Sequence, residues 1–393
     1  MERIIVHTSE PSSGAARYVS ELVAGLAANH ARVTLFCPPT FAHLSNVKSC
    51  GASVAFAAHR SIECGSFVNR VARNIRFLLG TARRQLRATR RGDIVHVQFP
   101  LYFPAGLAFF VLARMRRCPI VFTAHDPIPH KWLLPRSLRP LEWNMLRCAY
   151  CLSDRIIVHN ETGKAVLVNQ FRQHPGKIVV IPHGPLAASQ PIDSFPAGAF
   201  SILLFGSIRE NKGVHLAIQA VQALNTGSAH QVQLTIAGEV ANAREQTYWE
   251  HCLHLINQQP SGIRVINRYI EDSEVGALVS EHHAMLLPYA GFTSESGVAA
   301  LALANRRPII ATRVGGLAAL LNQSPCGIPI QEDSVEGVAE AIRKAWQAGP
   351  DALRCMGEAG ANLMRSDRSW TEIGRRTIAV YSEVHEASVG ARN

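Results

Sequence analysis

The chain has 393 residues, 47% of them hydrophobic and 18% charged, and a formal net charge of +11. A single hydrophobic core stops growing near roughly 250–300 residues, and this composition excludes a disordered chain, so we expect two folded domains. Residues 1–186 carry 24 Lys and Arg against nine Asp and Glu, whereas the rest carries 16 against 20, which predicts an acidic partner or surface for the first half.

The cysteines and the start of the chain indicate in which cell compartment the protein is expected. Nine cysteines, an odd number, are scattered along the chain, and Met1 leads directly into a strand-like segment at residues 3–7. We therefore expect a protein of the reducing cytoplasm without a secretory leader. Residues 94–113 are the most lipid-like window, but His96, Gln98 and two prolines leave it too short to span a bilayer.

The first segments predict a parallel sheet. Residues 3–7 and 31–36 read as strands, and residues 15–26 between them as a helix with one apolar face, which makes a βαβ unit. Gly14 stands just before this helix. Backbone N–H groups point outward there, and a glycine allows a ligand to approach closely.

Residues 67–91 predict a basic amphipathic helix. Its apolar residues fall in one arc of about 120°, arginines occupy most of the remainder, and no acidic residue interrupts it. Such a helix either packs its apolar stripe on the domain and presents arginines to an anionic surface, or lies in a membrane interface. We favour an anionic membrane over a solvated face and rank nucleic acid below it. The arginines expected to face the membrane are Arg70, Arg73, Arg76, Arg83, Arg84 and Arg87.

Several later segments of the first half end in polar residues where strands stop. Residues 93–98 and 119–124 read as strands, and His125 and Asp126 follow the second of them. The carboxyl edge of a parallel sheet is its functional side. Further strands are expected at 153–159 and 177–184, and a segment rich in Pro, Ala and Ser then reads as a linker. The expected parts of the chain are therefore 1–186, 187–199, 200–367 and 368–393.

The second half opens with a strand, a basic loop and a helix. An apolar run at 202–206 is followed by Arg209 and Lys212, and apolar residues then recur at helical spacing from Val214. Two cations three residues apart at the carboxyl end of a parallel strand can face one anion, and phosphate suits this place. The alternative is a pair of solvated loop charges.

A second phosphate-binding element is expected after the strand at 284–289. Ser296 and Gly297 begin a helix, and a helix start presents free N–H groups with a partial positive charge. No D-x-D, Walker or G-x-G-x-x-G motif is present, which disfavours a metal site, an NTPase and a dinucleotide enzyme.

These motifs together resemble those of family 4 glycosyltransferases of the GT-B type. The resemblance rests on Phe-Gly-Ser-Ile-Arg-x-x-Lys-Gly, Thr-Ala-His-Asp, Ile-Pro-His-Gly and the Leu-Pro-Tyr strand with its Ser-Gly helix start. It covers almost the whole chain. It implies an α/β fold of two Rossmann-like, doubly wound domains facing across a cleft, with a C-terminal helix near 370–385 that crosses back to the first domain.

The resemblance also implies roles for single residues. Arg209 and Lys212 hold the donor diphosphate, His125 reaches the transferred sugar, and Asp126 orients that histidine or contacts the acceptor. It implies no metal and no cofactor. The other expected donor contacts are Gly14, Ile270, Glu295, Ser296, Gly297 and Val298.

One departure separates this chain from many family members. They carry two glutamates eight residues apart, at the positions of Thr293 and Leu301 here, and neither of these is acidic. The chain looks like a subgroup with a Ser-Gly start, with Glu295 as the only nearby carboxylate. The group that holds the donor ribose stays open.

The expected function is that of a retaining glycosyltransferase. It moves a sugar from a UDP- or GDP-sugar to a lipid-linked or growing polysaccharide acceptor, as a peripheral protein on the inner membrane face. The alternatives are a nucleotide-sugar-binding protein or a UDP-N-acetylhexosamine 2-epimerase on the same fold.

Overall fold

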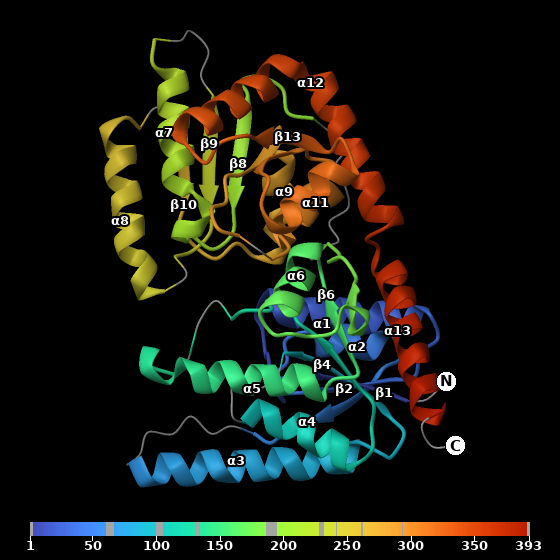
Figure 1. Cartoon of the computed structure of the whole chain (residues 1–393). Helices are drawn as coiled ribbons and strands as arrows, with labels where there is room; N and C mark the ends of the chain where they lie inside the picture. The colour runs from blue at the N-terminus through green and yellow to red at the C-terminus, as the bar shows by residue number, and fades with distance from the viewer. Residues whose placement is uncertain are drawn as a thin grey trace. The chain divides into compact units, whose positions relative to one another are not determined.

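The computed structural model describes residues 3–59, 67–99, 105–129, 132, 134–185, 195–227, 232–240, 242–260, 262–292 and 294–390. The chain forms two compact units (Figure 1). Unit 1 comprises Met1–Pro182 and Trp370–Asn393, and unit 2 comprises His183–Ser369. The sequence placed these divisions at 186/187 and 367/368. None of the described helices combines the length and apolar character needed to cross a membrane.

Unit 1 is built on a seven-stranded sheet in the order β3-β2-β1-β4-β5-β6-β7, with every neighbouring pair parallel. The strand order reverses between β1 and β4, the kind of point at which open α/β sheets bind ligands. The strands are β1 Ile4–Thr8, β2 Val33–Cys37, β3 Ser53–Phe56, β4 Ile94–Phe99, β5 Ile120–Thr123, β6 Arg155–Val158 and β7 Ile178–Val180.

Helices cover this sheet, and the last of them returns from the far end of the sequence. Gly25 of α1 and Gly374 of α13 bring the two helix backbones into contact, since a Cβ on Gly374 would collide with the Gly25 carbonyl. The Asn29 side chain adds hydrogen bonds to Gly25 O (2.8 Å) and Thr371 O (2.9 Å). The helices are α1 Ser13–Ala28, α2 Leu44–Ser49, α3 Phe67–Ala88, α4 Ala105–Met115, α5 Arg139–Leu152, α6 Glu161–Asn169 and α13 Trp370–Gly390.

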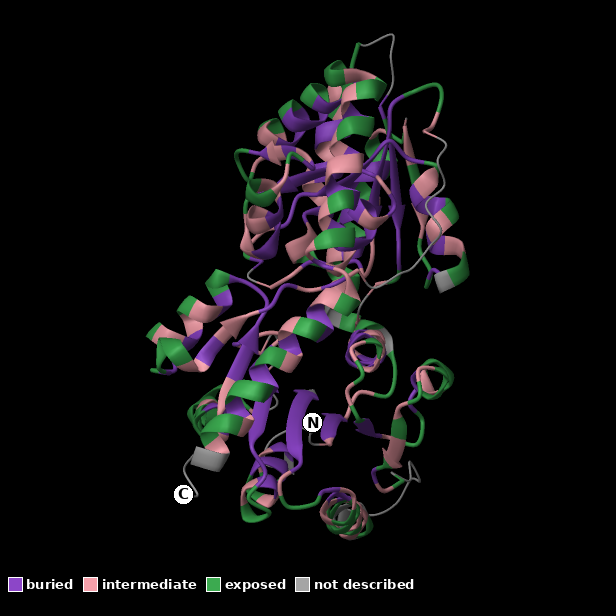
Figure 2. Cartoon of the chain, turned by 90° about the vertical axis from the view of Figure 1, so that its right-hand side faces the viewer, coloured by how far each residue is buried: buried purple, intermediate pink, exposed green. Residues whose placement is uncertain are grey.

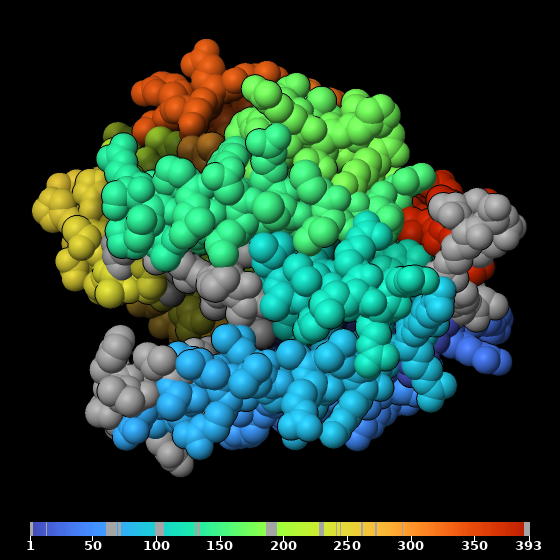
Figure 3. Space-filling model, turned by 60° about the horizontal axis from the view of Figure 1, so that its bottom comes forward, coloured from blue at the N-terminus to red at the C-terminus, as the bar shows by residue number. Residues whose placement is uncertain are grey.

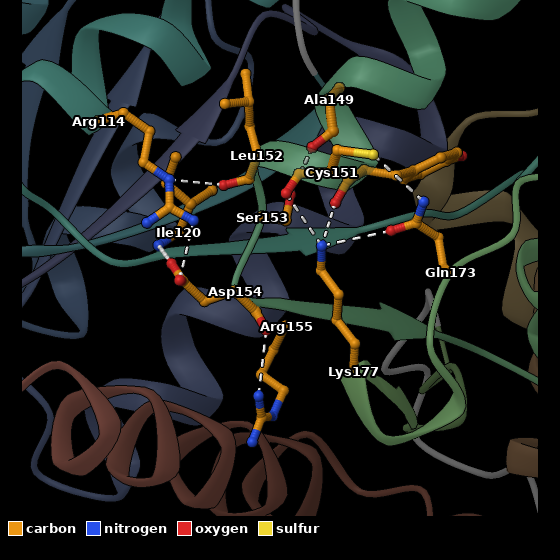
Figure 4. Close-up of polar contacts among 11 residues, drawn as sticks. Arg114, Ile120, Ala149, Cys151, Leu152, Ser153, Asp154, Arg155, Gln173 and Lys177 are labelled. Carbon is orange, nitrogen blue, oxygen red and sulfur yellow. Dashed lines mark hydrogen bonds and ion pairs between the residues drawn. The ribbon is translucent and has the colours of Figure 1, made fainter. Parts of the chain in front are cut away.

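Two cations close the C-terminus of α5 (Figure 4). Lys177 Nζ donates to the carbonyls of Tyr150 (2.6 Å) and Cys151 (3.2 Å), and Arg114 Nε donates to that of Leu152 (2.8 Å). Arg114 also pairs with Asp154, at 2.9 Å. A helix end leaves carbonyls unpaired and partly negative, so cations satisfy it. These bonds fix α5 against the segments that lead into β6 and β7.

Unit 2 has a six-stranded parallel sheet in the order β10-β9-β8-β11-β12-β13. Apolar clusters pack on both faces, and Figure 2 shows the strands as buried and the outer helix faces as exposed. The strands are β8 Ser201–Phe205, β9 Gln233–Ala237, β10 Ile263–Ile266, β11 Ala284–Leu287, β12 Ile309–Thr312 and β13 Gly327–Ile330. The helices are α7 Val214–Asn225, α8 Ala243–Gln258, α9 Asp272–Ser280, α10 Gly297–Ala304, α11 Gly315–Gln323 and α12 Val335–Ser366, which is kinked at Gly349. The predicted fold of two doubly wound α/β domains is confirmed.

Candidate functional site

The basic loop after β8 is pressed against the segment that follows β11. A 3-10 turn, Glu210–Lys212, leads to Gly213, whose φ of 65° is left-handed and therefore suits glycine. A Cβ on Gly213 would collide with the carbonyl of Pro288, and Asn211 O accepts a hydrogen bond from Ala290 N at 3.0 Å. The loop that carries both predicted cations therefore has one defined position in unit 2.

The Lys212 ammonium lies over two aromatic rings. Its Nζ lies 3.6 Å from the centroid of the Tyr289 ring and 5.1 Å from that of Phe292. Within the described part of the chain, no carboxylate forms an ion pair with it. Burial, and secondly the charge of Arg209, lowers the Lys212 pKa from 10.5 to about 7. A desolvated ammonium without a counter-ion gains most from an incoming anion.

The start of α10 lies beside this loop. Gly206, at the end of β8, has a φ of 106°, and a Cβ there would stand 3.4 Å from Val298 Cγ2. Ser296 caps the helix, because its hydroxyl accepts a hydrogen bond from Ala299 N at 3.2 Å. The first turn of a helix leaves backbone N–H groups without intrahelical partners. The structure thus brings together two elements that are about ninety residues apart in the sequence.

Glu295 points into the interior of unit 2. Its carboxylate pairs with Arg368 at 3.1 Å, with both side chains at most 3% exposed. A Cβ on Gly316 would stand 2.5 Å from the Glu295 carboxyl group, so α11 closes over it. The carboxylate therefore holds the C-terminal end of α12 in place, and its expected contact with the donor stays a prediction.

The two remaining expected donor contacts, Gly14 and Ile270, and the two positions that lack a glutamate lie in varied surroundings. Ile270 packs its side chain in the core cluster that also includes Leu203 and Leu287. Leu301 is buried in α10 and offers no polar group to a ribose. Thr293 lies outside the described residues. Gly14 lies exposed in the first turn of α1, in unit 1. The roles of Gly14 and Ile270 stay predictions.

His125 is held on both sides within unit 1. Its Nε2 lies 3.0 Å from Gln98 Oε1, and its Nδ1 lies 3.0 Å from His159 Nε2. The Tyr18 ring meets it edge to face, with the centroids 4.6 Å apart. His125 and Asp126 are both half-buried at the carboxyl edge of β5.

Two side chains that were not predicted as site residues hold this histidine. Gln98 lies on β4 and His159 follows β6, and both are buried. A signal was present, since polar residues at 96 and 98 interrupt a strand whose other residues are apolar. Buried polar groups are nearly always hydrogen-bonded, so such residues predict a polar network.

The middle of the apolar stripe on the basic helix α3 faces outward. Thr81 and Gln85 are the buried residues of its described part, whereas Ile75 is 51% and Leu79 is 62% exposed. The alternative in which the stripe packs on the domain is therefore wrong for these positions. The Arg70 side chain lies outside the described residues. Of the other predicted arginines, Arg73 is half-buried and Arg76, Arg83, Arg84 and Arg87 are exposed.

Known protein families and individual proteins match this chain over most of its length. The model of Glycosyltransferase Family 4 matches residues 12–184, and that of Glycosyl transferases group 1 matches residues 199–348. A glycogen synthase of Mycobacterium tuberculosis is 27% identical over 74% of this chain and 69% of its own. A D-inositol 3-phosphate glycosyltransferase of Pseudarthrobacter chlorophenolicus is 24% identical over 98% of this chain and 94% of its own.

Solved structures share the fold. A sucrose-phosphate synthase of Thermosynechococcus elongatus superposes with a TM-score of 0.74 and 16% identity, over 98% of this chain and 100% of that one. HepE of Anabaena, solved with UDP and glucose, superposes with a TM-score of 0.71 and 13% identity over 97% and 100%. The two family models cover successive parts of the sequence, and each falls on one parallel sheet. The chain therefore belongs to the GT-B glycosyltransferases and is an enzyme of the hexosyltransferase class.

Proposed function

We propose that this enzyme transfers a hexose, with retention of configuration, from a UDP- or GDP-sugar that binds to unit 2. The observation that carries the proposal is Lys212, an ammonium held on two aromatic rings without a carboxylate partner in the described residues. Arg209 and the first turn of α10 supply further positive charge beside it. HepE, which has a similar fold, was solved with UDP and with UDP-glucose, which supports a nucleotide sugar.

The chemistry follows from that charge. When the bond between sugar and diphosphate breaks, negative charge collects on the leaving phosphate. Cations and helix N–H groups that are already in place stabilise this charge without reorganising, so they lower the barrier. Arg209 and Lys212 then do the work that a metal ion does elsewhere, and His125 of unit 1 contacts the transferred sugar. Retention needs no enzymic nucleophile when the leaving phosphate assists the acceptor hydroxyl.

A donor panel tests this function. The purified chain is incubated with UDP- and GDP-sugars, and release of the nucleoside diphosphate is measured with and without added chelator. We expect release with one donor that survives the chelator, and at least a hundredfold loss in the Arg209→Ala, Lys212→Ala double variant. Lys164→Ala, on the surface of α6 in unit 1, is the control for loss of a cation. No release with any donor, or full activity in the double variant, would refute the proposal.

The same assay separates the alternatives. A 2-epimerase converts the donor sugar into its epimer and needs acid and base groups around it, whereas a transferase moves the sugar to an acceptor or, slowly, to water. A binding protein gives a thermal shift with the donor and no product. A soluble 2-epimerised sugar that forms without an acceptor would favour the epimerase.

We also propose that the acceptor is a lipid-linked or growing glycan at the inner face of a membrane, and that α3 docks there. Figure 3 shows α3, in light blue, along the face of unit 1 next to α4. The exposed Ile75 and Leu79 stand beside exposed arginines. On α4, Val111 is 43% and Met115 is 73% exposed. Apolar side chains ringed by arginines, with no acidic residue on the helix, suit an anionic interface and are unusual on a solvated face.

Vesicle sedimentation tests the docking. We expect binding to anionic vesicles that weakens with salt and with Leu79→Asn, and little binding to neutral vesicles. Trp346→Ala, an exposed apolar residue of unit 2, is the matched control and should bind like the wild type. Equal binding to neutral vesicles, or no effect of Leu79→Asn, would contradict it. Nucleic-acid binding would instead show as a steep salt dependence with DNA or RNA.

A further inference from the structure

His125 is the half-exposed end of a buried hydrogen-bonded chain in unit 1. His159 Nδ1 lies 2.9 Å from the carbonyl oxygen of Ile181, which can only accept, so this nitrogen carries the hydrogen. The other nitrogen, Nε2, lies 3.0 Å from His125 Nδ1, so the two rings share one hydrogen bond. The main chain beyond β7 thus holds the His159 ring and, through it, the ring of His125.

The hydrogen-bonded chain continues on the other side of His125 and reaches the C-terminal helix α13. The Gln98 amide meets His125 Nε2 through its Oε1 at 3.0 Å and His96 Nε2 through its Nε2 at 2.8 Å. His96 Nδ1 in turn lies 2.6 Å from the hydroxyl of Tyr381 on α13. Gln98, His96 and Tyr381 are at most 1% exposed, so water does not replace these bonds.

The buried His96 stays neutral and transmits orientation. Burial lowers the pKa of His96 to about 3, so at neutral pH one ring nitrogen donates and the other accepts. Thr123 Oγ1, 2.8 Å from His96 Nε2, adds a second polar partner on β5. Because each group can satisfy its neighbour in only a few ways, a change at Tyr381 alters the arrangement at Gln98 and hence at His125.

A second contact joins α13 to the same histidine through aromatic rings. Trp370, the first residue of α13, meets Tyr18 edge to face with the ring centroids 5.0 Å apart. Tyr18 meets His125 at 4.6 Å in the same manner. The chain crosses from unit 2 into unit 1 between Ser369 and Trp370. The helix that returns from unit 2 therefore reaches His125 at two points.

We propose that α13 positions the His125 imidazole for sugar transfer, through Tyr381, His96 and Gln98 on one side and through Trp370 and Tyr18 on the other. Tyr381 and Trp370 are thus positioning residues of the reaction. The inference rests on the proposed role of His125 toward the transferred sugar. We therefore expect substitutions of Tyr381 and Trp370 in α13 to lower the turnover rate. The affinity for the diphosphate, which binds to unit 2, should stay unchanged.

Ring-nitrogen NMR on the full chain with 15N-labelled histidine tests the coupling without any substrate. Tyr381→Phe removes one hydroxyl and keeps the ring, and it should shift the resonances of both His96 and His125, the latter identified by its loss in His125→Gln. Val384→Ala, a buried position on the same helix outside the network, is the matched control and should leave His125 unshifted. Unshifted His125 in Tyr381→Phe, or equal shifts in the control, would overturn the proposal.

Kinetics test the consequence. In Tyr381→Phe, which loses one hydrogen bond, and in Trp370→Phe, which alters the ring contact with Tyr18, we expect kcat to fall about tenfold, with an unchanged dissociation constant for UDP or GDP. An equal fall in kcat in Val384→Ala would show a general loss of stability and overturn the positioning role. If the wild type transfers no sugar, the proposed function fails, and the NMR result still decides whether α13 controls His125.

Discussion

The pKa of Lys212 makes binding of the donor diphosphate depend on pH. In the free enzyme, burial lowers this pKa from 10.5 to about 7, so the ammonium loses its proton as the pH rises above 7. A phosphate beside it favours the charged form and should return the pKa to near its ordinary value, so binding takes up a proton. The phosphate itself is already a dianion above pH 7, since its second pKa is near 6.

The size of the effect follows from this linkage. With a pKa of about 7 in the free state and about 10 in the bound state, affinity for UDP or GDP should fall about 15-fold between pH 7 and pH 8.5. Calorimetry at several pH values, in buffers of different ionisation enthalpy, gives both the affinity and the number of protons taken up.

Two variants complete the experiment. Lys212→Met should weaken binding and abolish its pH dependence, because the titrating group is gone. Arg209→Gln should weaken binding and keep the pH dependence, since Lys212 still titrates. An affinity that stays constant from pH 7 to pH 8.5, or a pH dependence that survives in Lys212→Met, would show that Lys212 is not the group that takes up the proton.

Three further predictions concern unit 2 and are measured by denaturation. Lys212→Met should stabilise the ligand-free protein by about 1–3 kcal/mol at pH 7 and by little at pH 10, because the lowered native pKa makes wild-type stability rise with pH between about 7 and 10.5; a larger gain at pH 10 would contradict this. Arg368→Ala leaves the Glu295 charge buried without its partner and should cost about 3–5 kcal/mol, against less than about 1 for the exposed Arg375→Ala; equal costs would contradict a structural ion pair. Gly213→Ala should cost more than about 1 kcal/mol and weaken UDP binding, because the residue is left-handed and meets Pro288; wild-type affinity and stability would count against the packed loop.

Much of the fold was predictable from the sequence, because buried parallel strands read as short apolar runs between helical patterns. The run at 202–206 and that at 263–266 became β8 and β10 at nearly the expected bounds. The short strands β3 and β13 were missed. In β3 two of the four residues are exposed, and β13 contains a proline, so neither gives a clear apolar run.

The site residues were predictable only where they lie close together in the sequence. Arg209 and Lys212 are three residues apart and follow a strand, so their sequence spacing already brings them together. The partner of Glu295 could not be found, because Arg368 is distant in sequence and depends on how α12 ends. The helical period of α3 gave its apolar arc but not the direction that this arc faces, which depends on the contacts of Thr81 and Gln85 with the domain.

A crystal structure of the chain with bound UDP or GDP would show whether the basic loop of unit 2 and the start of α10 hold the donor diphosphate. We expect diphosphate oxygens within hydrogen-bonding distance of Lys212 Nζ, the Arg209 guanidinium and the backbone N–H groups of the first turn of α10. Diphosphate bound elsewhere, with the ammonium still resting unpaired on Tyr289, would contradict it.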